Sequence, residues 1–362
     1  MKCVMNVEIL PENERRYRSV DFENLKFGKL FSDHMLEMHY KDGVWNEPTV
    51  KPYSTIAFHP SLHALHYGQS VFEGMKAYYS SEGTINIFRP WAHFERLTNS
   101  CRRMCMPEVP EDIFLNGLKK LVELDWPWVP KTFGHALYIR PLMFASQEYI
   151  AAVEANEYRF YVITSPVAAY YESGFKPVKL TTSENYVRAV SGGTGSAKAA
   201  GNYGGSFLPA RLAKERGFTQ VLWLDAKEGR YVEEVGTMNI FFLMGDTLVT
   251  PELDGAILPG VIRRSVIQIA QDWGMEVQER KISIDEVMAG YESGQLKEVF
   301  GTGTAAVIAP VGLIDHQKTE LRFDMENIGP FAQKMYQEIT GIQYGKTDDR
   351  YGWNLPVTVG GM

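Results

Sequence analysis

The sequence predicts an α+β fold in two domains, and three observations support this prediction. The chain has 362 residues, of which 45% are hydrophobic, and this is enough to bury two cores. The predicted strands come mostly in hairpins and do not alternate one for one with helices. The segment Glu172–Pro177 has the composition of a linker. We therefore expect a smaller N-terminal domain over residues 1–171, a linker over 172–185 and a larger C-terminal domain over 186–362.

Two hairpins are predicted in the first half. Residues 33–40 alternate roughly between apolar and polar, and the turn at 41–43 leads into Val44–Trp45. A second hairpin is expected from Lys76–Tyr79 and Thr84–Phe88. Between them, the glycine-punctuated segment His66–Gly74 is too short for a regular element and suits the edge of a cleft.

The remaining elements follow from helical spacing and from glycine and proline positions. Helices are expected to open at Pro90 and Pro110, and strands at 136–140 and 158–163 complete the first domain. The second domain is expected to contain a helix over 206–216 and a helix that opens at 258–262 and runs to 273, with strands over 220–224, 231–234, 237–243, 247–250 and 298–300. Its loops are expected to meet on one side of its sheet.

Composition excludes several classes of function. The net charge is -7, from 37 basic and 44 acidic residues, and no basic run interleaves with aromatic residues, so nucleic acid is not expected as a partner. No stretch of about 18 apolar residues is present and the N-terminus lacks a secretory pattern, which predicts a cytoplasmic protein without a membrane segment. Cys101 and Cys105 are four residues apart without a second pair, so no metal site is expected.

The stretch Ser191–Gly205 holds a single cation, Lys198, among glycines and alanines. These residues leave open volume and flexible backbone around the amine, although a surface linker has a similar composition. A phosphate-binding P-loop is excluded, because it needs glycine before the lysine and a hydroxyl after it, and both neighbours are alanine. The remaining chemistry is a lysine that forms an imine with a carbonyl, which requires a partly neutral amine.

Such a lysine is typical of a pyridoxal phosphate site, which also needs a phosphate cup and a carboxylate facing the pyridine nitrogen. Pro259 and Gly260 directly precede a helical run, whose first N–H groups suit a dianion. Thr237 offers a hydroxyl, and Arg96 offers a bidentate cation. Taken singly, these are an ordinary helix start and an ordinary solvated arginine. Glu234 lies among apolar residues, where burial demands a cationic partner such as a protonated pyridine nitrogen.

Four motifs occur in order along the chain, namely Lys198-Ala-Ala-Gly-Asn-Tyr203, Glu234-Val-Gly-Thr-Met-Asn239, Leu258-Pro-Gly-Val-Ile-Arg263 and Phe300-Gly-Thr-Gly-Thr-Ala305. The first half adds Phe31-Ser-Asp-His-Met-Leu36, Phe72-Glu-Gly74 and Leu137-Tyr-Ile-Arg140. Together they resemble the branched-chain amino-acid aminotransferases, a family of fold-type IV pyridoxal-phosphate enzymes, over most of the chain.

This resemblance implies a homodimer with pyridoxal 5′-phosphate in the cleft between the two domains. The implied reaction is transamination of L-leucine, L-isoleucine and L-valine with 2-oxoglutarate, giving branched-chain 2-oxo acids and L-glutamate by a ping-pong mechanism.

The resemblance also implies roles for individual residues. Lys198 is expected to form the internal aldimine and to move the proton between the substrate α-carbon and the cofactor. Glu234 is expected to face the pyridine nitrogen, and Tyr203 to bond the ring hydroxyl. The expected phosphate ligands are Arg96, Thr237, Val261, Ile262 and Thr304, of which the aliphatic residues act through main-chain N–H.

For the substrate, the resemblance places the α-carboxylate at Thr304–Ala305, near Tyr67. The far carboxylate of 2-oxoglutarate is expected to bind Arg140 with Tyr138. The side-chain pocket is expected to be lined by Phe31, Tyr67, Phe72, Tyr138, Tyr170 and Thr237.

The sequence departs from the family's pattern in two ways. The C-x-x-C that animal members carry after the last motif is replaced by Ala306 and Ala309, so no thiol switch is expected there. The residues expected to reach into the neighbouring subunit's pocket are Ile150 and Ala152, and the small Ala152 leaves the preferred substrate size open.

Two alternatives compete with this function. Fold-type IV also contains D-amino-acid aminotransferases and aminodeoxychorismate lyase, which keep the cofactor and change the reaction. The Tyr138–Arg140 pair and the Glu234-Val-Gly-Thr sequence favour the branched-chain transaminase. A non-enzymatic binder of phosphate ligands would keep the cup but has no need of the imine-forming Lys198.

Overall fold

The computed structural model describes residues 5–168 and 176–359. Its contacts define two compact units. The first comprises residues 5–168, Ala197–Ala200 and 341–359, and the second comprises residues 176–196 and 201–340. This division differs from the expected one at three places. Residues 197–200 and 341–359 pack with the first unit although they were expected in the C-terminal domain, and residues 176–185, expected as part of a linker, belong to the second unit and contain a strand, β10 (Val178–Thr182). Long-range strand pairing is the physical reason for these differences.

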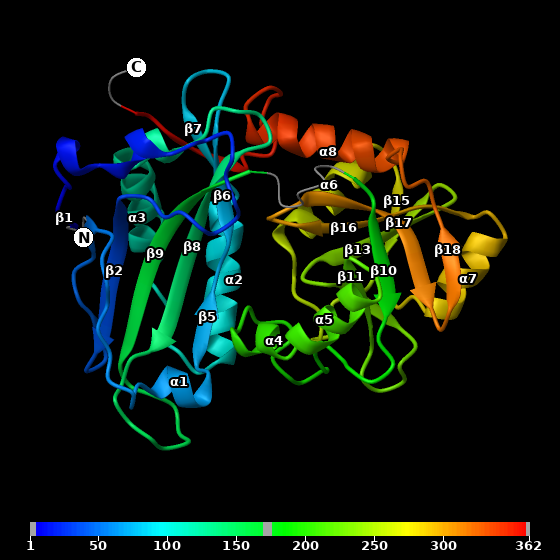
Figure 1. Cartoon of the computed structure of the whole chain (residues 1–362), viewed down its shortest axis with the longest axis horizontal. Coiled ribbons are helices and arrows are strands. Elements are labelled where there is room, and N and C mark those ends of the chain that lie inside the picture. Colours follow the sequence, from blue (N-terminus) through cyan, green and yellow to red (C-terminus); the bar gives the residue numbers. More distant parts are fainter. Residues whose placement is uncertain (1–4, 169–175, 360–362) are drawn as a thin grey trace. The chain divides into compact units, whose positions relative to one another are not determined.

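The first unit is built on a sheet with the order β1-β4-β2-β9-β8-β6-β7-β19, in which β3 also pairs with β2 and β5 with β8 (Figure 1). All of its pairs are antiparallel except β1 with β4. The strands are β1 (Asn6–Val7), β2 (His34–Lys41), β3 (Val44–Trp45), β4 (Thr49–Pro52), β5 (Ser70–Phe72), β6 (Met75–Tyr79), β7 (Ile85–Phe88), β8 (Ala136–Ala145), β9 (Tyr158–Val167) and β19 (Asn354–Val357).

Two amphipathic helices supply the other half of this unit's core. Leu97 and Cys101 of α2 and Phe114 and Leu118 of α3 are fully buried in one cluster with sheet residues such as Leu36. The helices are α1 (His63–Tyr67), α2 (Pro90–Arg103) and α3 (Glu111–Leu124), with short 3-10 helices at Glu12–Glu14, Arg16–Ser19 and Trp126–Trp128. Both predicted hairpins and both predicted proline-led helices are confirmed.

One prediction for this unit was wrong. Residues 66–74 were expected to hold no regular element, but the segment contains the end of α1 and the whole of β5. Gly68 ends α1 with a left-handed φ of 66°, and β5 is then fixed by pairing with β8. That pairing is tertiary, so local sequence does not reveal it.

The second unit contains a nine-stranded mixed sheet with the order β12-β11-β10-β17-β16-β13-β14-β15, and β18 pairs with β17. Its strands are β10 (Val178–Thr182), β11 (Gln220–Leu224), β12 (Val232–Val235), β13 (Asn239–Met244), β14 (Thr247–Thr250), β15 (Glu276–Glu279), β16 (Leu296–Gly303), β17 (Val307–His316) and β18 (Thr319–Arg322). Its helices are α4 (Gly201–Gly204), α5 (Phe207–Glu215), α6 (Val261–Asp272) and α7 (Ile284–Glu292), and α8 (Pro330–Gln343) ends in the first unit. Among the described residues, no helix combines the length and the apolar character needed to cross a membrane.

The glycine-rich segment before Lys198 is shaped by close packing at Gly195. A Cβ atom at Gly195 would lie 2.0 Å from the carbonyl oxygen of Ala256. Arg188 donates from Nη2 to the carbonyl oxygens of both residues. At Gly201, six residues further along the chain, an added Cβ atom would have no neighbour within 4 Å. The glycine content of this segment is therefore explained in part by close packing, and not only by the need for open space around Lys198.

Replacing Gly195 by alanine is expected to destabilise the protein by about 1–3 kcal/mol, since the 254–257 loop must move to admit a methyl group. Gly201→Ala is the matched control and is expected to leave the unfolding midpoint almost unchanged. Thermal unfolding of the two variants beside the parent protein measures the difference. Equal midpoints for both variants would contradict the packing account.

Candidate active site

In the first unit, the backbone on either side of Lys198 is held like a short extra strand. Phe72 N–H donates to the carbonyl oxygen of Lys198 at 3.1 Å, and Ala200 N–H donates to that of Ser70 at 3.0 Å. The Lys198 N–H donates to Ser100 Oγ on α2 at 2.9 Å. These bonds fix the main chain at Lys198 against β5 and α2, so the amine starts from a defined position.

The ring of Phe72 contacts two cations. Lys198 Nζ is 4.8 Å from the ring centroid, and Cζ of Arg140 is 4.5 Å from it. Arg140 donates from Nη2 to the Tyr138 hydroxyl at 2.8 Å. A side chain at Gly74 would clash with that hydroxyl, because its Cβ would lie 2.1 Å away. The structure thus brings together four of the predicted residues, Lys198, Phe72, Tyr138 and Arg140.

Arg140 is a cation without a carboxylate partner among the described residues. Its Nε atom is buried and makes no hydrogen bond there. Lys76, which lies opposite Tyr138 in the β6–β8 pair, adds a buried cation, and burial lowers the pKa of its ammonium group to about 8. Sequence reasoning did not select Lys76. This face of the sheet is suited to receive an anion.

Arg96 is oriented by a carboxylate that sequence reasoning assigned no role. Glu73 is completely buried and accepts hydrogen bonds from Arg96 Nε at 2.7 Å and Nη2 at 2.9 Å. Its Oε2 also lies 2.7 Å from His93 Nδ1, at hydrogen-bond distance. Burial alone would raise the pKa of Glu73, but the Arg96 guanidinium outweighs it and holds the pKa well below its usual range. Burial lowers the pKa of His93.

The Glu73–Arg96 ion pair changes the expectation that Arg96 binds phosphate through two of its nitrogens. The Nε–Nη2 edge of Arg96 is used by Glu73, so it does not offer that edge for a bidentate bond to phosphate. Arg96 stays a predicted phosphate ligand. The signal for Glu73 was its place in the Phe72-Glu-Gly74 motif, where a lone acid stands among apolar residues and glycine.

Three expected pocket residues are not joined to this cluster by the described contacts. Phe31 stacks on Tyr53 at 5.4 Å. Tyr67 is 40% exposed, and its ring contacts are with His63 and His66. Tyr170 lies outside the described residues. The roles of these three residues remain predictions.

In the second unit, Glu234 is buried and is held by three groups. Its Oε2 forms an ion pair with Arg188 Nε at 2.5 Å, and its Oε1 accepts from Asn239 Nδ2 at 2.9 Å and from Leu258 N–H at 3.3 Å. The predicted need for a cationic partner is therefore met within the chain by Arg188. Sequence reasoning missed this arginine, although it is a lone cation in the apolar run from Val187 to Val190.

Asn239 connects the segments expected to form the phosphate cup. Besides its bond to Glu234, its Nδ2 donates to the Leu258 carbonyl oxygen at 2.9 Å, and it pairs with Thr302 across β13 and β16. A Cβ at Gly260 would lie 1.9 Å from Asn239 Oδ1, so only glycine fits there. The segment before α6 is thereby packed against the start of β13.

The predicted cup residues lie on three neighbouring segments of this unit. The first helical bond of α6 runs from Arg264 N–H to the Gly260 carbonyl oxygen, which leaves the N–H groups of Val261 and Ile262 without acceptors inside the helix. Thr237 lies in the turn between β12 and β13. Thr304 and Ala305 lie in the turn after Gly303, and a Cβ at Gly303 would be 3.2 Å from Met238 Cγ. Tyr203 lies on α4 and is half-buried.

Comparison with known proteins assigns the chain to a family. The amino-transferase class IV model matches residues 70–314. Branched-chain-amino-acid aminotransferase 2 of Bacillus subtilis (strain 168) is 46% identical over 338 residues, which are 93% of each chain. The branched-chain-amino-acid aminotransferase of Mycolicibacterium smegmatis is 45% identical over 336 residues, or 91% of each chain.

Solved structures of branched-chain aminotransferases are also similar to this chain. The branched-chain aminotransferase of Thermoproteus uzoniensis with norvaline has a TM-score of 0.73 and 28% identity, over 90% of this chain and 100% of that chain. The T.th. branched-chain amino acid aminotransferase with pyridoxamine 5′-phosphate has a TM-score of 0.71 and 29% identity, over 88% of this chain and 97% of that chain.

These findings show that the chain is a class IV aminotransferase. Within that class it belongs to the branched-chain-amino-acid aminotransferase family, and the predicted fold-type IV architecture is confirmed. Enzymes of this class use pyridoxal phosphate, so this is the cofactor. The donors of the second unit fit it, since free helical N–H groups and threonine hydroxyls suit a phosphate dianion and an anchored carboxylate suits a pyridinium.

Glu73→Gln is expected to cost about 3 kcal/mol of unfolding free energy, because it leaves the Arg96 guanidinium buried without its counter-charge. The matched control is Glu108→Gln, which breaks an exposed pair with Arg102 on the same helix as Arg96; its expected cost is below about 1 kcal/mol. Denaturant titration measures both. A Glu73 variant as stable as the control would contradict the structural role of this carboxylate.

Proposed function

We propose that the protein exchanges amino groups between L-leucine, L-isoleucine or L-valine and 2-oxoglutarate by a ping-pong mechanism. The observation that carries this proposal is Arg140, which has no carboxylate partner among the described residues and lies beside Phe72 and Tyr138. An apolar ring suits a branched aliphatic side chain, and an uncompensated guanidinium suits the distal carboxylate of 2-oxoglutarate. The names of the relatives support amino-group transfer from branched-chain amino acids.

Lys198 is the proposed catalytic residue. When bound, pyridoxal phosphate supplies an electron sink for the charge left on the substrate α-carbon. Lys198 Nζ would hold the cofactor and would carry the proton between the substrate α-carbon and the cofactor. The backbone bonds to Phe72 and Ser100 support this role, because they hold the main chain of Lys198 in place.

The cofactor ligands are proposed as the sequence predicted them. Glu234, anchored by Arg188 and Asn239, faces the pyridine nitrogen and favours its protonated form. Tyr203 donates to or accepts from the ring hydroxyl. The phosphate is bound by Arg96, Thr237, Val261, Ile262 and Thr304.

Substrate binding is proposed to use two anion receptors. The Thr304–Ala305 turn binds the α-carboxylate, and Arg140 with Tyr138 binds the distal carboxylate of 2-oxoglutarate or glutamate. Phe31, Tyr67, Phe72, Tyr138, Tyr170 and Thr237 line the side-chain pocket. Each added methylene that is buried there contributes about 0.8 kcal/mol.

A homodimer in the cytoplasm is part of the proposal. Ile150 is 65% exposed, Val153 is 54% exposed and Tyr67 is 40% exposed within one chain, and a second copy would cover them.

The proposed function predicts a half-reaction with defined stereochemistry. L-Leucine, L-isoleucine or L-valine added without an acceptor is expected to bleach the visible absorbance of the bound cofactor, and 2-oxoglutarate is expected to restore it. Lys198→Ala is the control and is expected to abolish this cycle. Bleaching by D-alanine but not by the L-branched amino acids would instead support a D-amino-acid aminotransferase.

Arg140→Ala is expected to raise the KM for 2-oxoglutarate by about 10- to 100-fold, because it removes a charge-assisted bond to the distal carboxylate. The KM for leucine is expected to change much less. Arg159→Ala, on the neighbouring strand β9, is the control and is expected to affect neither substrate. Steady-state kinetics with each substrate varied measures the split. Equal losses for leucine and 2-oxoglutarate would refute the assigned role of Arg140.

A further inference from the structure

The second unit contains a cavity of about 380 Å³ that no residue of the proposed aminotransferase site lines. This volume lies within the range of small-molecule sites, about 300–1,000 Å³. Five carboxylates line it, namely those of Asp225, Glu228, Glu233, Glu252 and Asp254. Lys227 and Lys281 are the lysines among its lining residues, so carboxylates are in excess.

Glu233, on β12, is the unusual member of this set. It is 4% exposed, and its Oε2 accepts no hydrogen bond within the part of the chain that the structure describes. Burial, followed by the negative charge of Asp254, raises the pKa of its carboxyl group to about 7, and Glu234 and Asp225 act in the same direction. Arg188 opposes them but pairs with Glu234. A buried acceptor without a donor is costly, so this carboxyl group is unusual for a purely structural residue.

Other carboxylates of the cavity serve the fold. Asp225 accepts backbone N–H groups from residues 227, 228, 230 and 231, which closes the 225–231 loop. Asp254 Oδ1 accepts from Ala256 N–H at 2.9 Å. The wall is therefore built from hydrogen-bonded loops, while Glu233 is left without a donor.

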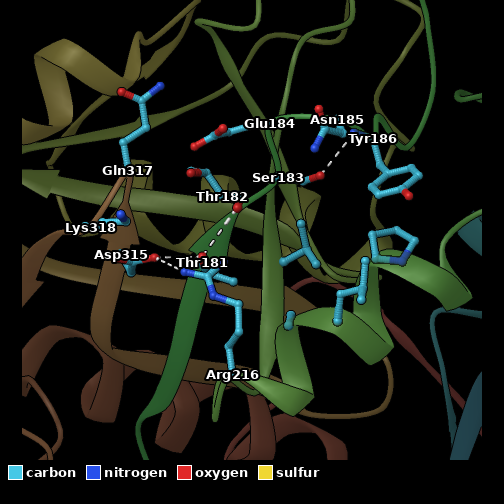
Figure 2. A pocket seen from close by; sticks show the side chains of 14 residues that line it. Thr181, Thr182, Ser183, Glu184, Asn185, Tyr186, Arg216, Asp315, Gln317 and Lys318 are labelled. Atoms are coloured by element: carbon cyan, nitrogen blue, oxygen red, sulfur yellow. Dashed lines mark hydrogen bonds and ion pairs between the residues drawn. The ribbon is translucent and has the colours of Figure 1, made fainter.

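A second cavity of this unit, about 340 Å³ in volume, shows the contrasting arrangement. Figure 2 shows its buried carboxylate, Asp315, in contact with Thr181 and Arg216, which donate to it at 2.9 Å and 2.8 Å. There the chain itself satisfies the buried acid. At Glu233 it does not, and a donor from outside the chain would.

We propose that the cavity at Glu233 binds a small organic cation that carries N–H donors, an ammonium or guanidinium group, with the Glu233 carboxylate as its principal acceptor. The described residues contain no group of three or more His, Cys, Asp or Glu side chains arranged to bind a metal, which favours an organic cation. Tyr231 adds an aromatic wall that already accepts a cation, since Lys281 Nζ lies 5.2 Å from its ring centroid. This site is separate from transamination and does not depend on it.

Binding is expected to depend on pH, because the cation requires the ionised acid. The charged groups that face Glu233 are Asp225, Asp254, Glu234 and Arg188, together with the cavity residues Glu228, Glu252, Lys227 and Lys281. Because the pKa of Glu233 is about 7, the fraction of Glu233 that is ionised falls roughly tenfold between pH 8 and pH 6. The affinity for the cation is expected to fall with it.

The test is calorimetric titration of the full-length, cofactor-loaded protein with methylguanidinium chloride, which has N–H donors and does not form imines readily. Saturable binding of one cation per chain is expected at pH 8, with about tenfold weaker binding at pH 6. Tetramethylammonium, which has no N–H group, is expected to bind at least about fivefold more weakly. No saturable binding of methylguanidinium, or equal affinity at both pH values, would overturn the proposal.

Glu233→Gln keeps the size of the side chain and removes its charge. It is expected to weaken methylguanidinium binding at pH 8 by about tenfold or more and to remove the pH dependence. Glu228→Gln, at an exposed position of the same cavity, is the matched control and is expected to change affinity less than about threefold. Equal losses in both variants would show attraction by overall charge only, and would reject Glu233 as the acceptor. Methylguanidinium is also expected to raise the unfolding midpoint of the parent at pH 8 but not that of Glu233→Gln, and an equal rise in both would count against the site.

Discussion

A carboxylate that leaves water must be met by donors or by a cation, and the candidate site residues of both units are placed by this requirement. In the first unit, Glu73 is met by Arg96 and His93. In the second, Glu234 is met by Arg188, Asn239 and the Leu258 N–H. Each cluster ties together segments that are distant in the chain.

The consequence of these clusters is preorganisation. Arg96 is held by two of its nitrogens before any anion arrives, and Ser100, one turn further along α2, receives the Lys198 N–H. Asn239 holds the residues before α6 against β13, so the first N–H groups of that helix point from a fixed position. Groups fixed in this way need not be ordered when a ligand binds, which lowers the cost of binding.

Arg140 and Glu233 show the opposite condition, a buried polar group that the described chain leaves partly unsatisfied. Such groups destabilise the folded protein slightly and persist where a ligand completes them. For Arg140 the proposed ligand is the distal carboxylate of a substrate. Glu233 has the opposite charge, so its carboxylate needs a hydrogen-bond donor. The excess of carboxylates around it favours a ligand that is a cation.

Local patterns predicted most of the elements. Glycine and proline mark helix ends, and alternation marks hairpins, because these are properties of neighbouring residues. Gly217 and Gly274, with φ of 86° and 77°, follow α5 and α6 where the sequence predicted their ends. Two of the failures were tertiary. β5 depends on β8, and the placement of residues 341–359 depends on β19 pairing with β7, a strand from the first quarter of the chain.

The sequence alone determined the inventory of the site: one lysine among small residues, a helix start with free N–H groups, an isolated glutamate, and ordered motifs that resemble one family. Only the tertiary structure decided which charges meet. Arg188 pairs with Glu234, Glu73 with Arg96, and Glu233 with no described group. The physical reason is that the strength of an ion pair depends on the distance between atoms and on their burial, and for residues far apart in the chain neither is encoded in the local pattern.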